Sequence, residues 1–422
     1  MKKRVVITGL GFVTSIGNSR AEVLESLRHA RSGIEVFAEL PDVAGGPRLA
    51  GTIKNFSFPS LQFEDWTYPP EYSIERNDLR SMSPHVVFAW CAMHQAIADA
   101  RLNPDRVSHP RTGAACASGG SMWMTYENLH VIITQGVHKC YPLSLPASMP
   151  GTLNANLAAC FKLKGAVVGF LSACASSAHA FGFGYDQISQ DRQDVVFVVG
   201  AEDCNKFSIL PFASVRALSV ETDPAKAPCP FDVKRDGFVG TGGATVLVLE
   251  ELESALERGA AIYAEVLGWG EAADGYNVMA PEPEGEGLAR AMRSALDQAN
   301  LAPGEIDYIN AHATGTTVGD ISEIKAIRRI FNTGRVPYVS STKALTGHGI
   351  CLAGAMEAAF TTLALHERFL PVSAKINRLD HACAGVPVIT QPVDVAPALA
   401  LSNSSGFGGA NVSVALGRWP RE

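Results

Sequence analysis

Short runs of β-branched residues alternate with longer amphipathic stretches along this chain, and this alternation constrains its fold most strongly. Apolar runs stand at 5–9, 166–173, 195–201 and 245–252, with an amphipathic stretch at 86–100. Near-continuous apolar runs of this length are typical of strands that helices cover on both faces. The alternation therefore predicts an α/β fold with a buried sheet.

The pattern restarts near residue 258. Residues 261–270 resemble the opening run as a strand that ends in glycines, and residues 338–365 repeat the order strand, polar turn and small-residue helix seen at 166–188. This weak repeat favours two similar α/β halves around a shared core, which we divide as 1–252 and 253–422. Residues 34–80, rich in proline, glycine and charge, are predicted to form a surface insertion.

Composition excludes several classes of protein. A chain of 422 residues with 47% hydrophobic and 18% charged residues can bury large cores. The formal net charge of −7 argues against nonspecific nucleic-acid binding. No signal-peptide pattern and no apolar run near the roughly 20 residues of a membrane span are present. The nine cysteines form no zinc-type cluster, and their odd number is typical of a reducing compartment. We expect a cytoplasmic protein that binds no metal, membrane or nucleic acid.

One cysteine stands at the junction of a predicted strand and a predicted helix. Cys174 follows the run 166–173 and precedes a segment of small residues. A helix N-terminus offers its positive dipole end and free backbone N–H groups, which favour a thiolate and could hold an oxyanion. A buried structural cysteine is the alternative. Gly182 and Gly184 within the predicted helix indicate that another element packs closely there.

A second candidate is a histidine that leaves the strand-like run IDYI into a turn rich in glycine and threonine. His312 could donate a hydrogen bond into a cleft from there, and Asp320 and Glu323 follow closely enough to orient its neighbours. A histidine satisfied within its own loop is the alternative for this residue taken alone.

Two further blocks carry polar or glycine-rich turns. In STKALTGH, Lys343 and His348 are five residues apart, so both can face one cavity, with the lysine favouring the neutral histidine. Taken alone, Lys343 would be half of an ion pair, with Glu323 as the candidate partner. The block at 401–411 has glycines that could turn a backbone N–H toward a ligand, or that could form a plain turn before the last strand.

Together the four blocks resemble one family. SACASSAHA around Cys174, HATGT-x-x-GD from His312, STKALTGH and NSSGFGGAN occur in the order and spacing of the elongating β-ketoacyl-acyl-carrier-protein synthases. The resemblance extends to residues 235–260 and to the opening of the chain. It implies an α/β thiolase-like fold, in which two duplicated halves form a five-layer α-β-α-β-α core.

The resemblance also implies a reaction. Cys174 would accept an acyl group from an acyl-carrier-protein thioester. His312 and His348 would stabilise the enolate formed when malonyl-carrier protein loses carbon dioxide, and Lys343 would set the local electrostatics. The product would be a 3-oxoacyl thioester, made in fatty-acid or related lipid or polyene biosynthesis.

Other residues receive supporting roles by the same resemblance. The backbone N–H groups of Cys174 and Phe407 would form the oxyanion hole, and the Phe407 side chain would gate the thiol. Asp320 and Glu323 would orient the catalytic residues without contacting the substrate. The loop that contains Gly120 would line the acyl pocket, where this glycine leaves space.

The resemblance further implies partners. Carrier proteins are acidic, so a positive rim is needed, and Arg76, Arg80 and Lys139 fall where the family places its carrier-protein contacts. No free cofactor is implied, because the phosphopantetheine arm of the carrier protein presents the acyl and malonyl thioesters. We expect a homodimer, with a heterodimer as the alternative.

The sequence departs from the family pattern in places. Ser405 stands where phenylalanine is usual, Thr317 where proline is usual, and GHGICLAGA replaces the common GH-(S/T)-LGAAGA. These differences bear on acyl-chain preference and gating.

Three other functions are alternatives to this one. A dinucleotide-binding oxidoreductase would need a glycine where Thr14 stands. A thiolase would need a second reactive cysteine, and Cys383 lies in no matching motif. A catalytic or chain-length-setting subunit of a heterodimeric ketosynthase, acting in specialised polyketide or polyene synthesis, is the main alternative.

Overall fold

The computed structural model describes residues 2–420, and ten of its strands hydrogen-bond in one continuous order, β11-β10-β12-β13-β9-β1-β8-β6-β4-β5. The strands of the first half are β1 (Val5–Val13), β4 (Thr112–Ala117), β5 (Val167–Phe170), β6 (Val195–Glu202) and β8 (Gly243–Glu251). Those of the second half are β9 (Ala264–Ala273), β10 (Tyr308–Asn310), β11 (Tyr338–Ser340), β12 (Leu399–Gly406) and β13 (Ala410–Arg418).

The two halves have the same topology. The order β5-β4-β6-β8-β1 in the first half matches β11-β10-β12-β13-β9 in the second, strand for strand. Parallel and antiparallel pairs also correspond, with three parallel strands followed by two antiparallel ones in each half. A short antiparallel ladder between β1 and β9 joins the halves. The predicted duplication is therefore confirmed, whereas the boundary at residue 252 stays a prediction.

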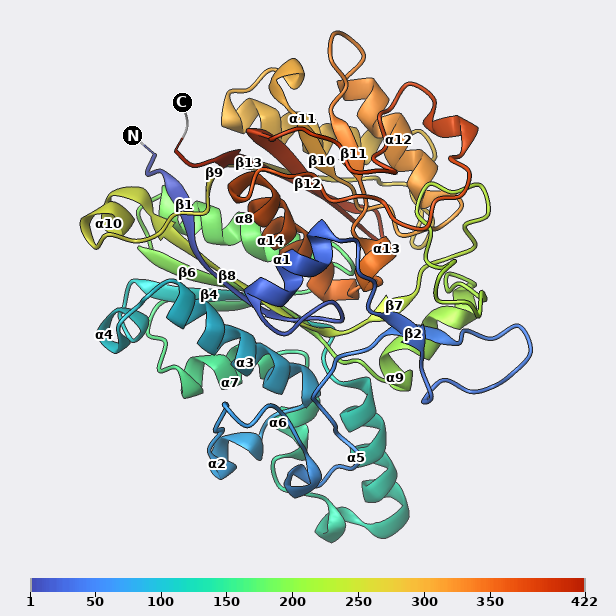
Figure 1. The fold of residues 1–422 in the computed structure, drawn as a ribbon. Coiled ribbons are helices and arrows are strands. Elements are labelled where there is room, and N and C mark those ends of the chain that lie inside the picture. The colour runs from blue at the N-terminus through green and yellow to red at the C-terminus, as the bar shows by residue number, and fades with distance from the viewer. Residues whose placement is uncertain (1, 421–422) are drawn as a thin grey trace.

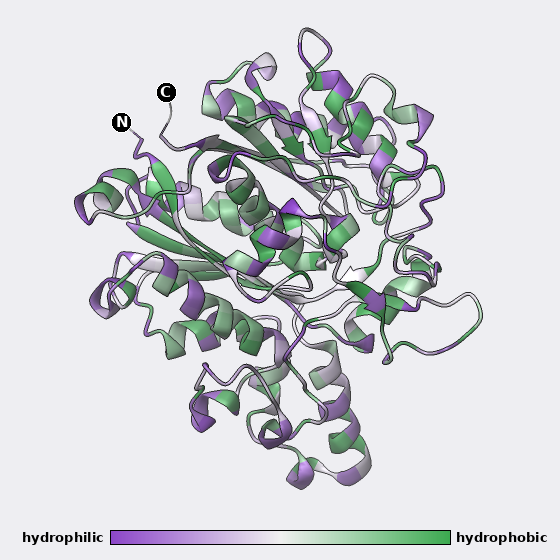
Figure 2. Cartoon of the chain, in the orientation of Figure 1, coloured by the Kyte–Doolittle hydropathy of each residue, from purple (hydrophilic) through white to green (hydrophobic). Residues whose placement is uncertain are grey.

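Helices complete a five-layer arrangement (Figure 1). The helices α8 (Ser176–Ser189) and α14 (Ala353–His366) lie between the two halves of the sheet, where α8 contacts β4 and β6 and α14 contacts β12 and β13. One outer layer holds α3 (Pro84–Asp99) and α7 (Thr152–Cys160), and the other holds α11 (Glu286–Ala299) and α12 (Gly319–Ile330). The strands and the central helices are largely hydrophobic (Figure 2), as the sequence pattern predicted.

The remaining elements are shorter, except for α5. The helices are α1 (Arg20–Arg28), α2 (Arg76–Leu79), α4 (Pro104–Val107), α5 (Met122–Gln135), α6 (Ser144–Ser148), α9 (Lys206–Ile209), α10 (Leu252–Glu257) and α13 (Lys343–Thr346). A small sheet contains β2 (Ile34–Val36), β3 (Leu49–Gly51) and β7 (Gly240–Thr241). Within residues 2–420 no helix combines the length and hydrophobicity that crossing a membrane requires.

Glycines allow the central helices to pack closely. A Cβ on Gly182 would lie 2.2 Å from the Trp269 ring, and a Cβ on Gly354 of α14 would lie 2.5 Å from the backbone nitrogen of Ala178 in α8. Neither position can accept a larger side chain without a shift of the backbone. The close packing predicted from Gly182 is confirmed.

The expectation that residues 34–80 form only a surface insertion is wrong for one part of that segment. β3 is buried and pairs with β7. A Cβ on Gly51 would lie 2.1 Å from the Thr346 carbonyl oxygen. The segment thus supports the turn after α13, because a short apolar strand within a polar stretch can still reach the core.

Candidate active site

The three residues predicted to carry the chemistry lie close together. Cys174 lies between β5 and α8, His312 follows β10, and His348 follows α13. The Cys174 Sγ lies 3.0 Å from His348 Nε2, and one donor atom from each of the three residues lies within 4.8 Å of the others. The two imidazole centroids are 5.2 Å apart. The parallel strands β5, β10 and β11 end nearby. Sites of this kind commonly form at the carboxyl ends of parallel strands.

The Cys174 thiol is neutral in the resting protein. The residue is 6% exposed, and it precedes the first residue of α8 by two positions. Burial raises the pKa of Cys174 to about 12, while the charge of Lys343 and the backbone N–H of Phe407 act in the opposite direction. The expectation that the helix terminus favours a resting thiolate is wrong, because desolvation exceeds these stabilising contacts.

Two buried carboxylates hold the backbone of the His312 loop. Glu323 accepts hydrogen bonds from the N–H of His312 at 3.0 Å and of Ala313 at 2.7 Å. Asp320 accepts bonds from the N–H groups two and three residues beyond the histidine, each at 3.1 Å. These carboxylates orient the loop through its main chain and do not bind the imidazole.

Lys343 forms a fully buried ion pair with Glu357 of α14. The predicted pairing of this lysine with Glu323 is wrong, because the turn into α13 brings Lys343 against the next helix. Burial raises the pKa of Glu357 to about 7, opposed by the lysine. Burial, and then the charge of Lys343, holds the pKa values of His312 and His348 well below the usual range. Both rings are therefore neutral, as the spacing from Lys343 predicted for His348.

The hairpin turn from β12 to β13 approaches the thiol. A Cβ on Gly406 would lie 2.6 Å from the Ser172 carbonyl oxygen and 3.1 Å from the Cys174 backbone nitrogen. The Phe407 ring contacts the Phe212 ring, with centroids 6.2 Å apart. A backbone N–H from this turn thus faces Cys174, as expected for the second donor of an oxyanion hole.

Ser405 anchors the same turn. Its hydroxyl donates to Asn411 Oδ1 at 2.8 Å, and the Asn411 amide donates to Asp274 at 2.7 Å. A phenylalanine at 405 could not make the first of these bonds. The departure from the family pattern therefore adds a polar tie between β12 and β13.

A cavity of about 90 Å³ opens at these residues. Its wall includes the following side chains: Cys174, His312, His348, Phe407, Ser405 and Leu288. Gly120 is not part of this wall. The donors and the thiol thus face a common space, which suits a reaction between two bound groups.

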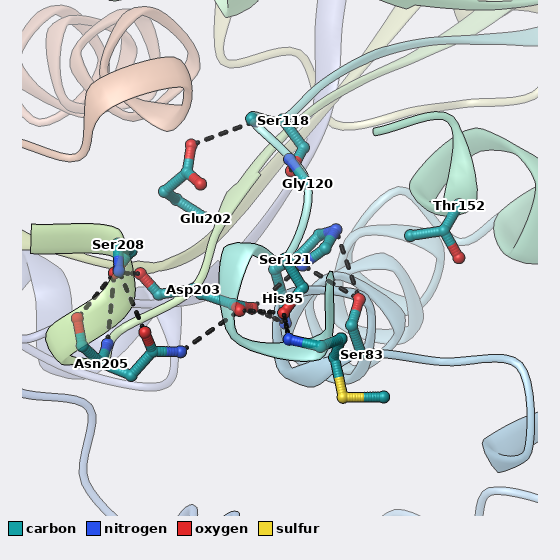
Figure 3. Close-up of polar contacts among 12 residues, drawn as sticks. Ser83, His85, Ser118, Gly120, Ser121, Thr152, Glu202, Asp203, Asn205 and Ser208 are labelled. Carbon is teal, nitrogen blue, oxygen red and sulfur yellow. Dashed lines mark hydrogen bonds and ion pairs between the residues drawn. The ribbon is translucent and has the colours of Figure 1, made fainter. Parts of the chain in front are cut away.

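Gly120 lies in a loop held by a buried polar network (Figure 3). Its φ is +80°, and a Cβ there would lie 3.0 Å from Pro150 Cα. Ser121 donates to Asp203 at 2.5 Å, and His85 contacts the same carboxylate at 3.0 Å. The loop is rigidly placed, and an acyl pocket at Gly120 stays a prediction.

The three basic residues expected to contact a carrier protein lie away from the thiol, in α2 and the 3-10 turn Val137–Lys139. Arg76 pairs with Glu64 at 2.7 Å. Arg80 donates to the Tyr141 hydroxyl at 2.8 Å, which brings α2 close to the segment that carries Lys139. The fold thus brings Arg80 near the Lys139 segment.

Two residues of the site, Glu357 and Asn403, were not predicted from the sequence. Glu357 pairs with Lys343, and Asn403 donates to Glu323 at 3.1 Å. Glu357 is the single charged residue in the apolar helix AGAMEAAFTTLAL, and a lone buried charge signals a partner. Asn403 gave no comparable signal.

Family models match most of the chain. Residues 2–255 match the model described as "Beta-ketoacyl synthase, N-terminal domain", and residues 263–377 match "Beta-ketoacyl synthase, C-terminal domain". A 3-oxoacyl-(acyl-carrier-protein) synthase 1 of Haemophilus influenzae is 39% identical, covering 99% of each chain.

Solved structures are similar along their whole length. A β-ketoacyl synthase from Burkholderia phymatum superposes with a TM-score of 0.87 at 33% identity, covering 99% of each chain. The ishigamide ketosynthase/chain length factor superposes with a TM-score of 0.88 at 28% identity, covering 99% of this chain and all of the other. The thiolase-like fold is therefore confirmed.

Proposed function

The chain belongs to the β-ketoacyl synthase family, an acyltransferase class of condensing enzymes, and we propose that it joins an acyl and a malonyl thioester through an acyl–Cys174 intermediate. Both thioesters would be carried by an acyl carrier protein, as the name of the Haemophilus relative states for that protein. The observation that supports this most is the meeting of Cys174 with two neutral histidines in one cavity.

The first half-reaction would transfer the acyl group. The Cys174 sulfur attacks the thioester carbonyl, the bond from that carbon to the pantetheine sulfur breaks, and the thiol proton ends on the released pantetheine. The backbone N–H groups of Cys174 and Phe407 would stabilise the oxyanion of the tetrahedral intermediate. His348 Nε2 lies 3.0 Å from Sγ, within hydrogen-bond distance of the thiol before attack.

The second half-reaction would form the carbon–carbon bond. Loss of carbon dioxide from the malonyl group leaves an enolate, whose oxygen would receive hydrogen bonds from neutral His312 and His348. The enolate carbon attacks the acyl–Cys174 carbonyl, the bond to sulfur breaks, and the thiolate takes a proton from solvent. Lys343, paired with Glu357, would keep both rings neutral so that each can donate without forming a buried cation.

A carrier protein would dock on the positive side chains of α2 and the Val137–Lys139 turn. Arg76 begins α2 and Arg80 directly follows this helix, and Lys139 lies two residues before Tyr141, whose hydroxyl accepts a hydrogen bond from Arg80. The phosphopantetheine arm would reach the cavity as part of the substrate, with no free cofactor. In a chain of net charge −7, these local positive groups would steer an acidic partner.

The assembled form would be a homodimer built on β5. This strand ends the sheet order and has one free edge, where Val168 and Leu171 are 36% and 64% exposed. A second β5 could pair with that edge across a two-fold axis and cover the apolar residues. The names of the curated relatives favour this synthase over a heterodimeric subunit, and the free cysteines suit a reducing cytoplasm.

Replacement of the histidines tests the division of roles. Losing one placed donor to a developing oxyanion costs about 10²–10³ in rate. His312→Ala and His348→Ala should therefore lose malonyl decarboxylation by that factor, yet still be acylated at Cys174 in a single turnover. Decarboxylation at the wild-type rate in either variant would contradict the proposal.

A further inference from the structure

Cys174, His312 and His348 present the donor set of a metal site. Thiolate and imidazole are the ligands that zinc prefers, and three such ligands with one open position are typical of zinc sites that bind a further group. Among the residues that the structure describes, this is the one group of three histidine, cysteine or acidic side chains whose donor atoms converge. We propose that these three residues bind one soft divalent cation, such as Zn²⁺, in place of the substrate.

The spacing of the donors fits this proposal. With Zn–S near 2.3 Å and Zn–N near 2.0 Å, tetrahedral donors lie about 3.5 Å apart. The Cys174 Sγ and His348 Nε2 are 3.0 Å apart, and all three donor atoms lie within 4.8 Å of one another. The required separation thus lies between the 3.0 Å of this pair and the 4.8 Å limit for all three atoms, so the donors must shift slightly to enclose a cation.

Hydrogen bonds hold the backbones of both histidines but not the Nδ1 atoms of their rings. Within residues 2–420 the Nδ1 atoms of His312 and His348 have no hydrogen-bond partner. The His312 N–H is held by Glu323, and the His348 N–H donates to the Val239 carbonyl at 2.7 Å. The ligands are therefore positioned without being locked away from a metal.

The charge balance also permits a cation. Lys343 is the nearby positive charge, and Glu357 forms an ion pair with it. Binding would replace the thiol proton by the metal and release that proton to solvent. The open space beside the three residues would hold a water as the fourth ligand.

Bound metal would occupy the sulfur and the two ring nitrogens that the proposed condensation uses. Such a cation would be a reversible inhibitor, competing with the acyl thioester for Cys174. The binding itself rests on geometry alone, and its measurement requires neither carrier protein nor thioester. Failure of the metal proposal therefore leaves the proposed condensation unaffected.

Zinc titration of the full-length, tag-free protein tests the site. Calorimetry should show one Zn²⁺ per chain, and iodoacetamide alkylation of Cys174, followed by peptide mass spectrometry, should be blocked by zinc and restored by EDTA. Cobalt should give a thiolate charge-transfer band. Cys174→Ala should abolish this band and the zinc binding, and His312→Ala should weaken binding at least about tenfold, since even outer-sphere changes cost about 10–100-fold.

Cys140→Ser is the matched control, because this half-buried thiol contacts Ser144 and lies outside the site. It should bind zinc like wild type. Zinc affinity unchanged in Cys174→Ala, or wild-type protein that binds no zinc, would overturn the proposal.

Discussion

At the residue scale, burial decides the chemical state of each group in the site. Desolvation raises the pKa of the Cys174 thiol and lowers the pKa values of both histidines, so all three are uncharged at neutral pH. The buried pair Lys343–Glu357 supplies the charge without leaving an isolated ion. A neutral thiol and two neutral hydrogen-bond donors can bind substrate without the penalty of a buried charge.

The charge of Lys343 can be tested by titrating the histidines. Carbon-13 NMR of histidine-labelled protein should show His312 and His348 neutral at pH 6, below their ordinary pKa of about 6.5. In Lys343→Met both midpoints should rise, because the positive charge that disfavours imidazolium is lost. They should stay below about 6.5, because burial persists.

Glu357→Gln serves as the control, since it keeps the lysine charge and removes its partner. The midpoints should then be no higher than in wild type. Identical titrations in wild type and Lys343→Met would contradict the assigned role of the lysine.

Residue chemistry was largely predictable from the sequence, since Cys174 and His312 follow strands, His348 follows the short helix α13, and all three carry a recognisable motif. The resting state of the thiol was not. A helix N-terminus is visible in a sequence, whereas the depth of burial depends on the β12–β13 turn that closes over the thiol from about 230 residues away. Lys343 was likewise paired with the wrong acid, because α14 contributes its partner from across a turn.

At the element scale, the turn from β12 to β13 determines where the Phe407 N–H lies. The sequence predicts strands best where β-branched residues cluster, as in β6 and β8. It missed β4, whose residues TGAACA are small, and it assigned the start of NSSGFGGAN to a turn although β12 extends to Gly406. Both strands are internal members of the sheet, so hydrogen bonding to two neighbours outweighs their weak intrinsic preference.

Gly406→Ala should displace this turn. Its added methyl would lie 2.6 Å from the Ser172 carbonyl oxygen, so the turn must move away from Cys174. Loss of the Phe407 oxyanion donor should slow acyl transfer by about 10²–10³, measured as the rate of acyl-enzyme formation in a single turnover. Gly304→Ala, where the methyl meets nothing within 4 Å, should acylate normally. Wild-type kinetics in Gly406→Ala would exclude this role for the turn.

At the scale of the whole molecule, duplication places the site. Two halves of equal topology face each other across α8 and α14 (Figure 1). The first half contributes the thiol, and the second contributes the histidines and the ion pair. The weak repeat in the sequence predicted this arrangement, because the same succession of strands and helices in each half builds the same topology. It could not indicate which surfaces remain for partners.

The free edge of β5 leads to a prediction about assembly. Wild-type protein should be a dimer by light scattering during gel filtration. Val168→Glu combined with Leu171→Glu should yield monomers, because two pairs of buried carboxylates would face each other across the axis. Val43→Glu, at an apolar residue 55% exposed in an early loop, should remain dimeric. A double variant that elutes with wild type would place the interface elsewhere.

Intact-protein mass spectrometry after mixing with an acyl carrier protein loaded with a saturated acyl chain tests the central claim most directly. Wild-type protein should gain the mass of one acyl group, peptide mapping should place it on Cys174, and malonyl-carrier protein should then remove it as a 3-oxoacyl product. Cys174→Ala should gain no mass. An adduct on another residue, or elongation by Cys174→Ala, would contradict the account.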